Sequence, residues 1–223
     1  GGVILAASSI LIDGASRLTT STLGNGDAGL ILAIARDRIT IDGNRSGIFS
    51  TVAPGVSQTA GAIVIGSNSL VLQNGAKISV DNAGSGSAGD IFITGLGVYL
   101  DRGAQISAIT KSGQGGNIEF QVGVLILNNN SNISTEAGTA EAGGNGGNIF
   151  ITGNSFRLGG DRAFIVSGKP IGNSNIRANA FTGNGGSIFI LAYKLTDIAR
   201  RADVTATNDI DASSRFGLSG TIN

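Results

Sequence analysis

The stretch GGNGGNIFIT at residues 143–152 decides the fold, because close variants of it recur along the whole chain. In this stretch Gly147 is followed two residues later by Ile149, and the same spacing of glycine and isoleucine occurs repeatedly. The pairs are Gly2/Ile4, Gly29/Ile31, Gly61/Ile63, Gly89/Ile91, Gly116/Ile118, Gly147/Ile149, Gly186/Ile188 and Gly220/Ile222. Internal repeats with periods of roughly 20–50 residues indicate structural units that stack on one another.

Each unit contains three short segments with the alternating, β-branched pattern of strands. In the unit that begins at Gly89 they are IFIT at 91–94, VYLD at 98–101 and AQISAIT at 104–110. The second segment recurs as ILID at 10–13, ITID at 39–42, LVLQ at 70–73, LILN at 125–128 and FRLG at 156–159. Short alternating runs bounded by Gly, Asn, Asp or Ser are typical of strands, and no segment has a helical apolar stripe.

One unit has too few apolar residues to bury a core alone, whereas stacked units can bury them in continuous columns. We therefore predict an all-β fold, a right-handed parallel β-helix of about seven turns with three short strands per turn. Residues 1–223 form a single solenoid segment, with turns that start near 2, 29, 61, 89, 116, 147 and 186 and a further turn near 220. The third strand contributes the column Leu18, Ile48, Ile78, Ile106, Ile133, Ile176 and Ile210.

The corners of the predicted turns account for much of the glycine, which makes up 37 of 223 residues. Pairs such as Asp42-Gly43 and Asn74-Gly75 follow the second strand, where glycine and asparagine tolerate a left-handed backbone. A second corner is richer in glycine, as in GSGSAG at 84–89. The last two units are longer, each with an extra apolar triplet at 163–165 or 203–205, which we expect to form an added loop or strand on one side.

Composition excludes several functional classes. The chain has 15 basic and 15 acidic residues, so no net charge favours nucleic acid or an anionic membrane surface. It contains no cysteine and no histidine, which excludes thiol nucleophiles, disulfides, zinc fingers and histidine-dependent triads. No apolar run is long enough for a membrane helix. We expect no cofactor, no metal, no nucleic acid partner and no membrane insertion.

Two motifs that could carry chemistry occur at the corners. Gly24-Gly26-Gly29 and Gly84-Gly86-Gly89 match the spacing of a dinucleotide-binding loop, but each leads into a strand and lacks the helix that binds pyrophosphate. A calcium-binding β-roll needs tandem aspartates, whereas the corners offer Asn148 or Ser187 at that position, and only Asp27 and Asp90 come close. The densest acidic group is formed by Asp197, Asp203, Asp209 and Asp211, and we interpret these as solvated corner residues.

The repeated pattern G-G-N-I-x-[IF]-x, followed by [IL]-x-[ILN] and [AN]-x-I-S, resembles passenger segments of filamentous-haemagglutinin-like exoproteins. SNIRANAFTGNGGSIFI at 174–190 and DIDASSRFGLSGTI at 209–222 are most similar to the glycine- and asparagine-rich repeat proteins of cyanobacteria. The resemblance covers nearly the whole chain. It implies a right-handed β-helix exported by two-partner secretion and located outside the cell or on its outer surface.

A candidate contact surface lies three residues after each repeat glycine, on the face opposite the isoleucine column. The residues there are Leu5, Leu32, Val64, Phe92, Glu119, Phe150 and Phe189, which we name the Gly+3 stripe. An exposed apolar stripe marks a contact surface. Either this stripe lies beneath a loop or the enlarged last units, or it supports lateral self-association.

These observations favour a non-catalytic structural or adhesive segment of a secreted or cell-surface filament, part of a longer rod that associates end to end or laterally. Two alternatives stay open, a carbohydrate-active β-helix (lyase or hydrolase) and a passive adhesin that binds a surface glycan. Cleavage of a glycosidic bond needs two carboxylates across it, for which the sequence offers Asp37/Asp42 or Asp101/Glu119. With two tyrosines and no tryptophan, the chain has few aromatic platforms for sugars.

Overall fold

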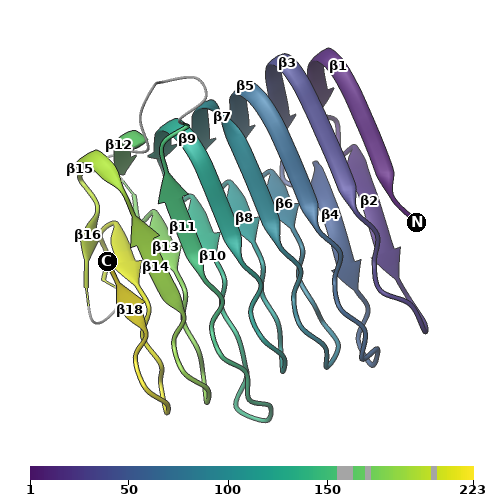
Figure 1. Cartoon of the computed structure of the whole chain (residues 1–223), viewed down its shortest axis with the longest axis vertical. Coiled ribbons are helices and arrows are strands. Elements are labelled where there is room, and N and C mark those ends of the chain that lie inside the picture. The colour runs from purple at the N-terminus through teal and green to yellow at the C-terminus, as the bar shows by residue number, and fades with distance from the viewer. Residues whose placement is uncertain (155–162, 169–171, 202–204) are drawn as a thin grey trace.

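The fold is that of a computed structural model, which describes residues 1–154, 163–168, 172–201 and 205–223. The described residues form strands and no helix, and the strands pair in parallel as a β-solenoid (Figure 1). Five long strands start successive turns: β1 (Val3–Ile12), β3 (Ile31–Asp42), β5 (Ile63–Gln73), β7 (Ile91–Asp101) and β9 (Ile118–Leu127). Each is followed by a shorter strand: β2 (Arg17–Thr22), β4 (Gly47–Val52), β6 (Lys77–Ser79), β8 (Gln105–Ser107) and β10 (Asn132–Ser134).

The remaining strands divide the last turns into shorter pieces. They are β11 (Ile149–Thr152), β12 (Ala163–Gly168), β13 (Asn175–Arg177), β14 (Ser187–Ile190), β15 (Ala192–Thr196), β16 (Ala199–Arg200), β17 (Asp209–Asp211) and β18 (Thr221–Ile222). One sheet has the order β1-β3-β5-β7-β9-β11-β14-β18, and the other has the order β16-β17-β13-β10-β8-β6-β4-β2. In Figure 1 the long strands lie side by side, and the loops that join each short strand to the next long strand lie together along one edge.

The prediction of three short strands per turn is wrong in one respect. The first two strands of a turn merge into one long strand in β1, β3, β5, β7 and β9. No residue between the two halves has a positive φ, so the chain passes from one half to the other without a tight corner. The expected third strand is the short strand, and a ladder of isolated bridges follows it. About five turns, β1 to β10, have this regular form, against the seven expected.

The predicted isoleucine columns are confirmed by the strand register. Ile31, Ile63, Ile91, Ile118, Ile149, Ile188 and Ile222 are successive register partners. The third-strand column from Leu18 to Ile210 is also in register throughout. Ile31, Ile63 and Ile106 are completely buried. The two columns face each other across the interior and form one continuous core.

The register of the first turn differs by one residue from the expected pair Gly2/Ile4. Val3 pairs with Ile31, and Ile4 pairs with Leu32 on the outward side, where 74% of its surface is exposed. Gly29 lies against the carbonyl group of Gly1, so Gly1 and Val3 hold the repeat positions of this turn. Because alternation reverses with a slip of one residue, Leu5 packs against the core and is not part of the outward stripe.

The enlarged sixth unit also differs from the expectation. The triplet at 163–165, expected as an insertion, belongs to β12, which pairs with the second half of β9 through Ile165↔Val124 and Val166↔Leu125. This strand therefore takes the position that the sequence assigned to FRLG at 156–159, a segment outside the described residues. In the seventh unit β15 pairs with β12, and of the triplet at 203–205 only Thr205 is described.

Candidate functional site

The Gly+3 stripe is present as an outward ladder on the first half of the long strands. Register places the following residues in one row: Ile4, Leu32, Val64, Phe92, Glu119, Phe150 and Phe189. Phe150 and Phe189 expose 39% and 37% of their surfaces, and Leu32, Val64 and Phe92 are half-buried. Of the two alternatives for this stripe, the described residues therefore favour an exposed surface.

A carboxylate interrupts the apolar row at its centre. Glu119 lies between Phe92 and Phe150 in adjacent strands and accepts a hydrogen bond from Nε2 of Gln121 at 2.9 Å. A shallow depression of about 270 Å³ is lined by Glu119 and its two phenylalanine neighbours together with Val64 and Asp90. A partner that covers the row would remove Glu119 from water, and the one hydrogen bond from Gln121 does not neutralise its charge, so an opposing donor or cation would be favoured.

The corner positions considered for calcium form a ladder of side-chain hydrogen bonds instead. Oδ1 of Asp90 accepts from the backbone N–H and from Nδ2 of Asn117 at 2.8 and 3.0 Å. Oδ1 of Asn117 accepts in the same way from Asn148, and Oδ1 of Asn148 accepts from the N–H of Ser187 at 3.0 Å. Each side chain therefore satisfies a backbone donor of the next turn, which gives the Asn of the GGNI repeat a structural reason. In the described ranges no three acidic residues gather as a metal site.

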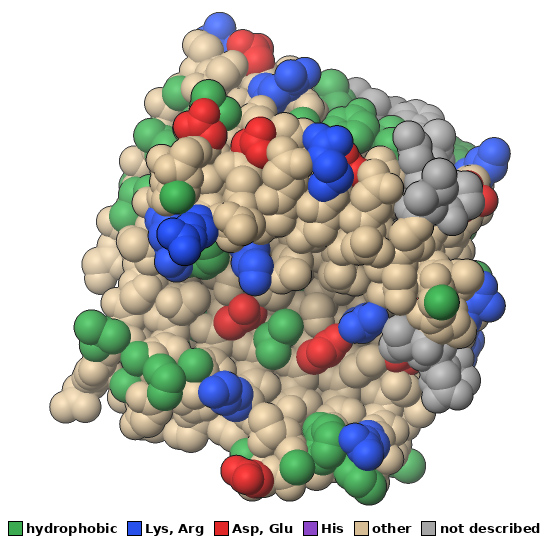
Figure 2. All heavy atoms as spheres, turned by 180° about the vertical axis from the view of Figure 1, so that it is seen from behind, with side chains coloured by type: hydrophobic (Ala, Val, Ile, Leu, Met, Phe, Trp, Pro, Cys, Tyr) green, Lys and Arg blue, Asp and Glu red, His purple; other side chains and the backbone are tan. Residues whose placement is uncertain are grey.

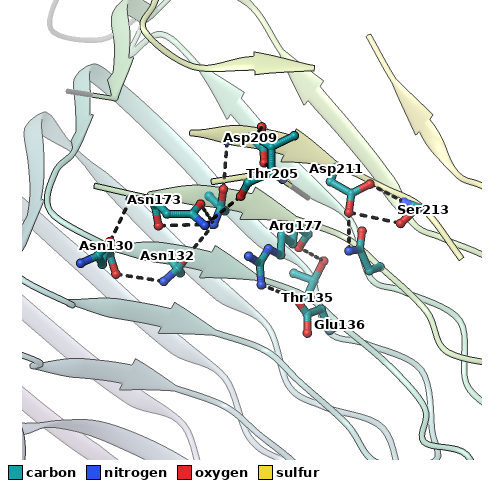
Figure 3. A network of polar contacts seen from close by, with 12 residues as sticks. Asn130, Asn132, Thr135, Glu136, Asn173, Arg177, Thr205, Asp209, Asp211 and Ser213 are labelled. Carbon is teal, nitrogen blue, oxygen red and sulfur yellow. Dashed lines mark hydrogen bonds and ion pairs between the residues drawn. The ribbon is translucent and has the colours of Figure 1, made fainter. Parts of the chain in front are cut away.

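The acidic residues near the C-terminal end are not all solvated, and the expectation is wrong for two of them. Asp209 and Asp211 are buried, with 0% and 1% exposure. Nε of Arg201 lies 2.6 Å from Oδ1 of Asp209, whose carboxylate also accepts hydrogen bonds from Thr205. Asp211 accepts from Nδ2 of Asn179 and from both donors of Ser213 (Figure 3). Asp203 lies outside the described residues. Asp209 and Asp211 therefore have structural partners.

Neither pair of carboxylates considered for sugar cleavage has the geometry of a catalytic pair. Asp37 and Asp42 lie on β3, separated by roughly 16 Å at the usual strand rise. Glu119 is the register partner of Phe92 near the start of β7, whereas Asp101 ends that strand roughly 30 Å further along. Glycosidase carboxyl groups lie about 5–9.5 Å apart.

Asp42 and Asp101 instead take part in a corner network. Oδ2 of Asp42 accepts from Nε2 of Gln73 at 2.8 Å, and its Oδ1 accepts from Nδ2 of Asn74 at 2.7 Å. These two hydrogen bonds, with a smaller contribution from the charge of Arg102, hold the pKa of Asp42 below its ordinary value. Nδ2 of Asn129 donates to Oδ1 of Asp101 at 2.6 Å one turn later. The network thus connects successive turns along this corner.

Figure 2 views the molecule from behind and shows acidic and basic side chains interspersed with small hydrophobic groups on that face. Sequence reasoning missed a basic depression formed around Phe49, because its members are far apart in the sequence and none belongs to a motif. In the sequence this depression is indicated only by Arg17 and Lys77, which occupy matching outward positions in the short strands β2 and β6.

Comparison with models of known protein families, with curated proteins and with solved structures found no match for this chain. The resemblance to filamentous-haemagglutinin-like exoproteins therefore stays a prediction. Among the described residues, no helix has the length and apolar character that a membrane crossing would need.

Proposed function

We propose that this chain is a non-catalytic structural segment of a secreted or cell-surface filament, in which stacked turns form a stiff spacer. The observation that carries the proposal is the unbroken parallel ladder from β1 to β18, with isoleucine stacked on isoleucine in one core. In such an array each turn is stabilised mainly by its two neighbours, so further turns can extend it without a change in the design.

Side-chain ladders at the corners support a mechanical role. The ladder from Asp90 through Asn117 and Asn148 connects backbone to side chain across successive turns, and the Asp42–Gln73 and Asp101–Asn129 bonds do the same at another corner. Both sets of bonds run from one turn to the next along the solenoid. Bending the stack would have to distort them together with the parallel backbone ladder.

The Gly+3 stripe supports a lateral contact between such segments. Its exposed members Phe150 and Phe189 continue a row that also contains Phe92 and Val64. Aromatic residues are enriched in protein interfaces, and a continuous row offers more apolar area than isolated residues do. Glu119 in the row favours an opposing surface that supplies a donor or a cation, which would fix the register of the contact.

The location outside the cell and the role of an adhesin rest on the sequence resemblance and are part of the same proposal. An adhesive surface on a stiff spacer would be held away from the body that carries it. The basic and acidic residues interspersed on the face in Figure 2 make a polar surface of mixed charge on that side.

The lateral contact can be tested by replacing Phe92 and Phe150 together with serine. We expect the wild-type protein to associate as its concentration rises in static light scattering, and the double variant to stay monomeric with an unchanged circular dichroism spectrum. Tyr99→Ser is the matched control, because Tyr99 exposes 40% of its surface on the other half of β7. A monomeric wild-type protein, or equal losses in the control, would contradict the lateral contact.

The absence of catalysis has its own test. The protein is incubated with acidic and neutral extracellular polysaccharides, and new reducing ends and unsaturated products are measured. We expect neither above the level of heat-denatured protein. Sustained product release that Glu119→Gln or Asp42→Asn abolishes would overturn the non-catalytic assignment.

A further inference from the structure

A basic depression opens beside the N-terminal short strands. It has a volume of about 580 Å³ and is lined by Ala15, Arg17, Asn44, Arg45, Phe49 and Lys77. Three of these six residues are cations, and none is acidic. Because the whole chain has 15 basic and 15 acidic residues, this positive charge is a local feature of the surface.

The register of the short strands brings two of the cations together. Arg17 on β2 pairs with Gly47 on β4, which in turn pairs with Lys77 on β6. Two strand spacings place the Cα atoms of Arg17 and Lys77 roughly 10 Å apart. Gly47, which lies between them, has no side chain, and the ring of Phe49 covers it, so the two cations flank an aromatic surface. Arg45 lies two residues before Gly47, at the corner between β3 and β4, and is exposed.

Phe49 holds one of the cations in place. The guanidinium carbon of Arg17 lies 4.1 Å from the centroid of the Phe49 ring. The ring itself lies against Gly47, where an added Cβ would come within 2.6 Å of two ring carbons. Stacking on an aromatic face leaves the N–H groups at the edge of the guanidinium free to donate. Arg17 is therefore oriented by packing rather than by an acidic partner.

Within the described residues, ion pairs involve Arg102, Arg177 and Arg201, and none involves Arg17, Arg45 or Lys77. We propose that this depression binds an oxyanion group, a carboxylate, sulfate or phosphate. Arg17 and Arg45 supply paired donors that match two oxygen atoms, and Lys77 supplies a further positive charge. This site adds a ligand chemistry to the structural role and does not depend on the Gly+3 stripe.

The first test uses inorganic sulfate and phosphate as probes, titrated against chloride at constant ionic strength and followed by backbone amide chemical shifts. We expect dissociation constants on the order of 1 mM, the range of a weak surface site. The triple variant Arg17→Gln, Arg45→Gln, Lys77→Gln should weaken binding at least tenfold. Arg36→Gln, Arg38→Gln, Lys111→Gln removes the same charge from exposed positions elsewhere and should bind as the wild type does.

Two results would overturn the proposal: equal weakening in the two triple variants, or sulfate shifts no larger than those from chloride. Phe49→Leu provides a further check, because it keeps all three cations and removes the ring beneath Arg17. We expect it to weaken sulfate binding severalfold, and unchanged binding would contradict the role assigned to the ring.

A second set of probes identifies the source of the oxyanion. Sulfated dextran, a polyuronate and polyphosphate are compared with neutral dextran by the same titration. If one anionic polymer binds more tightly than its free ion does, the Arg17/Arg45/Lys77 variant should lose this binding. That result would support the site and identify the preferred group. Binding of neutral dextran as tight as that of the sulfated polymer would overturn it.

Discussion

Gly116 lies beneath the carbonyl group of Gly89 in the preceding turn, and Gly147 lies beneath that of Gly116 in the same way. A Cβ at Gly116 would overlap the Gly89 carbonyl oxygen, although Gly116 has no positive φ. The repeat glycine is therefore required by the close approach of two backbones, whereas Gly75, with φ of 78°, is required by its corner conformation.

The first residue-scale prediction concerns this close approach. Gly116→Ala must push two turns apart, and we expect it to lower the free energy of unfolding by about 3 kcal/mol, the upper range for overpacking. Gly26→Ala is the control, because Gly26 has open space around it and no positive φ. Urea unfolding followed by circular dichroism measures both. A loss below about 0.5 kcal/mol in Gly116→Ala would contradict the packing argument.

Asp42 gives a prediction that depends on pH. Its pKa is lowered in the folded state from an ordinary value of 3.8, mainly by hydrogen bonds from Asn74 and Gln73. The carboxylate therefore stabilises the fold above pH 3.8, and this contribution is lost as pH falls through the lowered pKa. We expect the urea midpoint of the wild type to exceed that of Asp42→Asn at pH 7 and the difference to shrink below about pH 4. A constant difference from pH 7 to pH 2 would be inconsistent with this assignment.

At the scale of elements, the third-strand column depends on the same side chain in successive turns. Ile106 on β8 is completely buried between Ile78 and Ile133. Ile106→Ala leaves a cavity that its neighbours in the ladder cannot close, and we expect a loss of about 3 kcal/mol. Ile126→Ala, on the outward side of β9 beside Tyr99, should cost about 1 kcal/mol or less. Equal losses at the two positions, measured by urea unfolding, would show that the column does not dominate stability.

The sequence predicted these columns because alternation and spacing are local properties that repeat. It predicted the outward position of Phe92 and Phe150 for the same reason. The first turn was assigned one residue too late, since Val3 and Ile4 are both apolar and only the pairing with Ile31 decides between them. The basic depression was missed because Arg17, Gly47 and Lys77 become neighbours only through the register of three turns.

At the scale of the whole molecule, the parallel strands form a stack, and we expect that one turn can be removed if the register of the remaining turns is kept. Ile93 on β7 and Phe120 on β9 are register partners, so deletion of residues 93–119 joins Phe92 to Phe120 and leaves every inward position apolar. We expect this variant to retain a β-type circular dichroism spectrum and cooperative unfolding, with a lower free energy of unfolding, because each turn is supported mainly by its neighbours.

Deletion of residues 93–118 is the matched control, since it keeps one more residue and joins Phe92 to Glu119. That slip turns Glu119 toward the core and the following apolar residues toward solvent, because side chains alternate along a strand. A charge in the core without a partner is strongly unfavourable, so we expect the control to unfold or to aggregate. If both deletions unfold, the turns are not interchangeable units and the spacer model fails. If both fold equally well, register does not determine the stack.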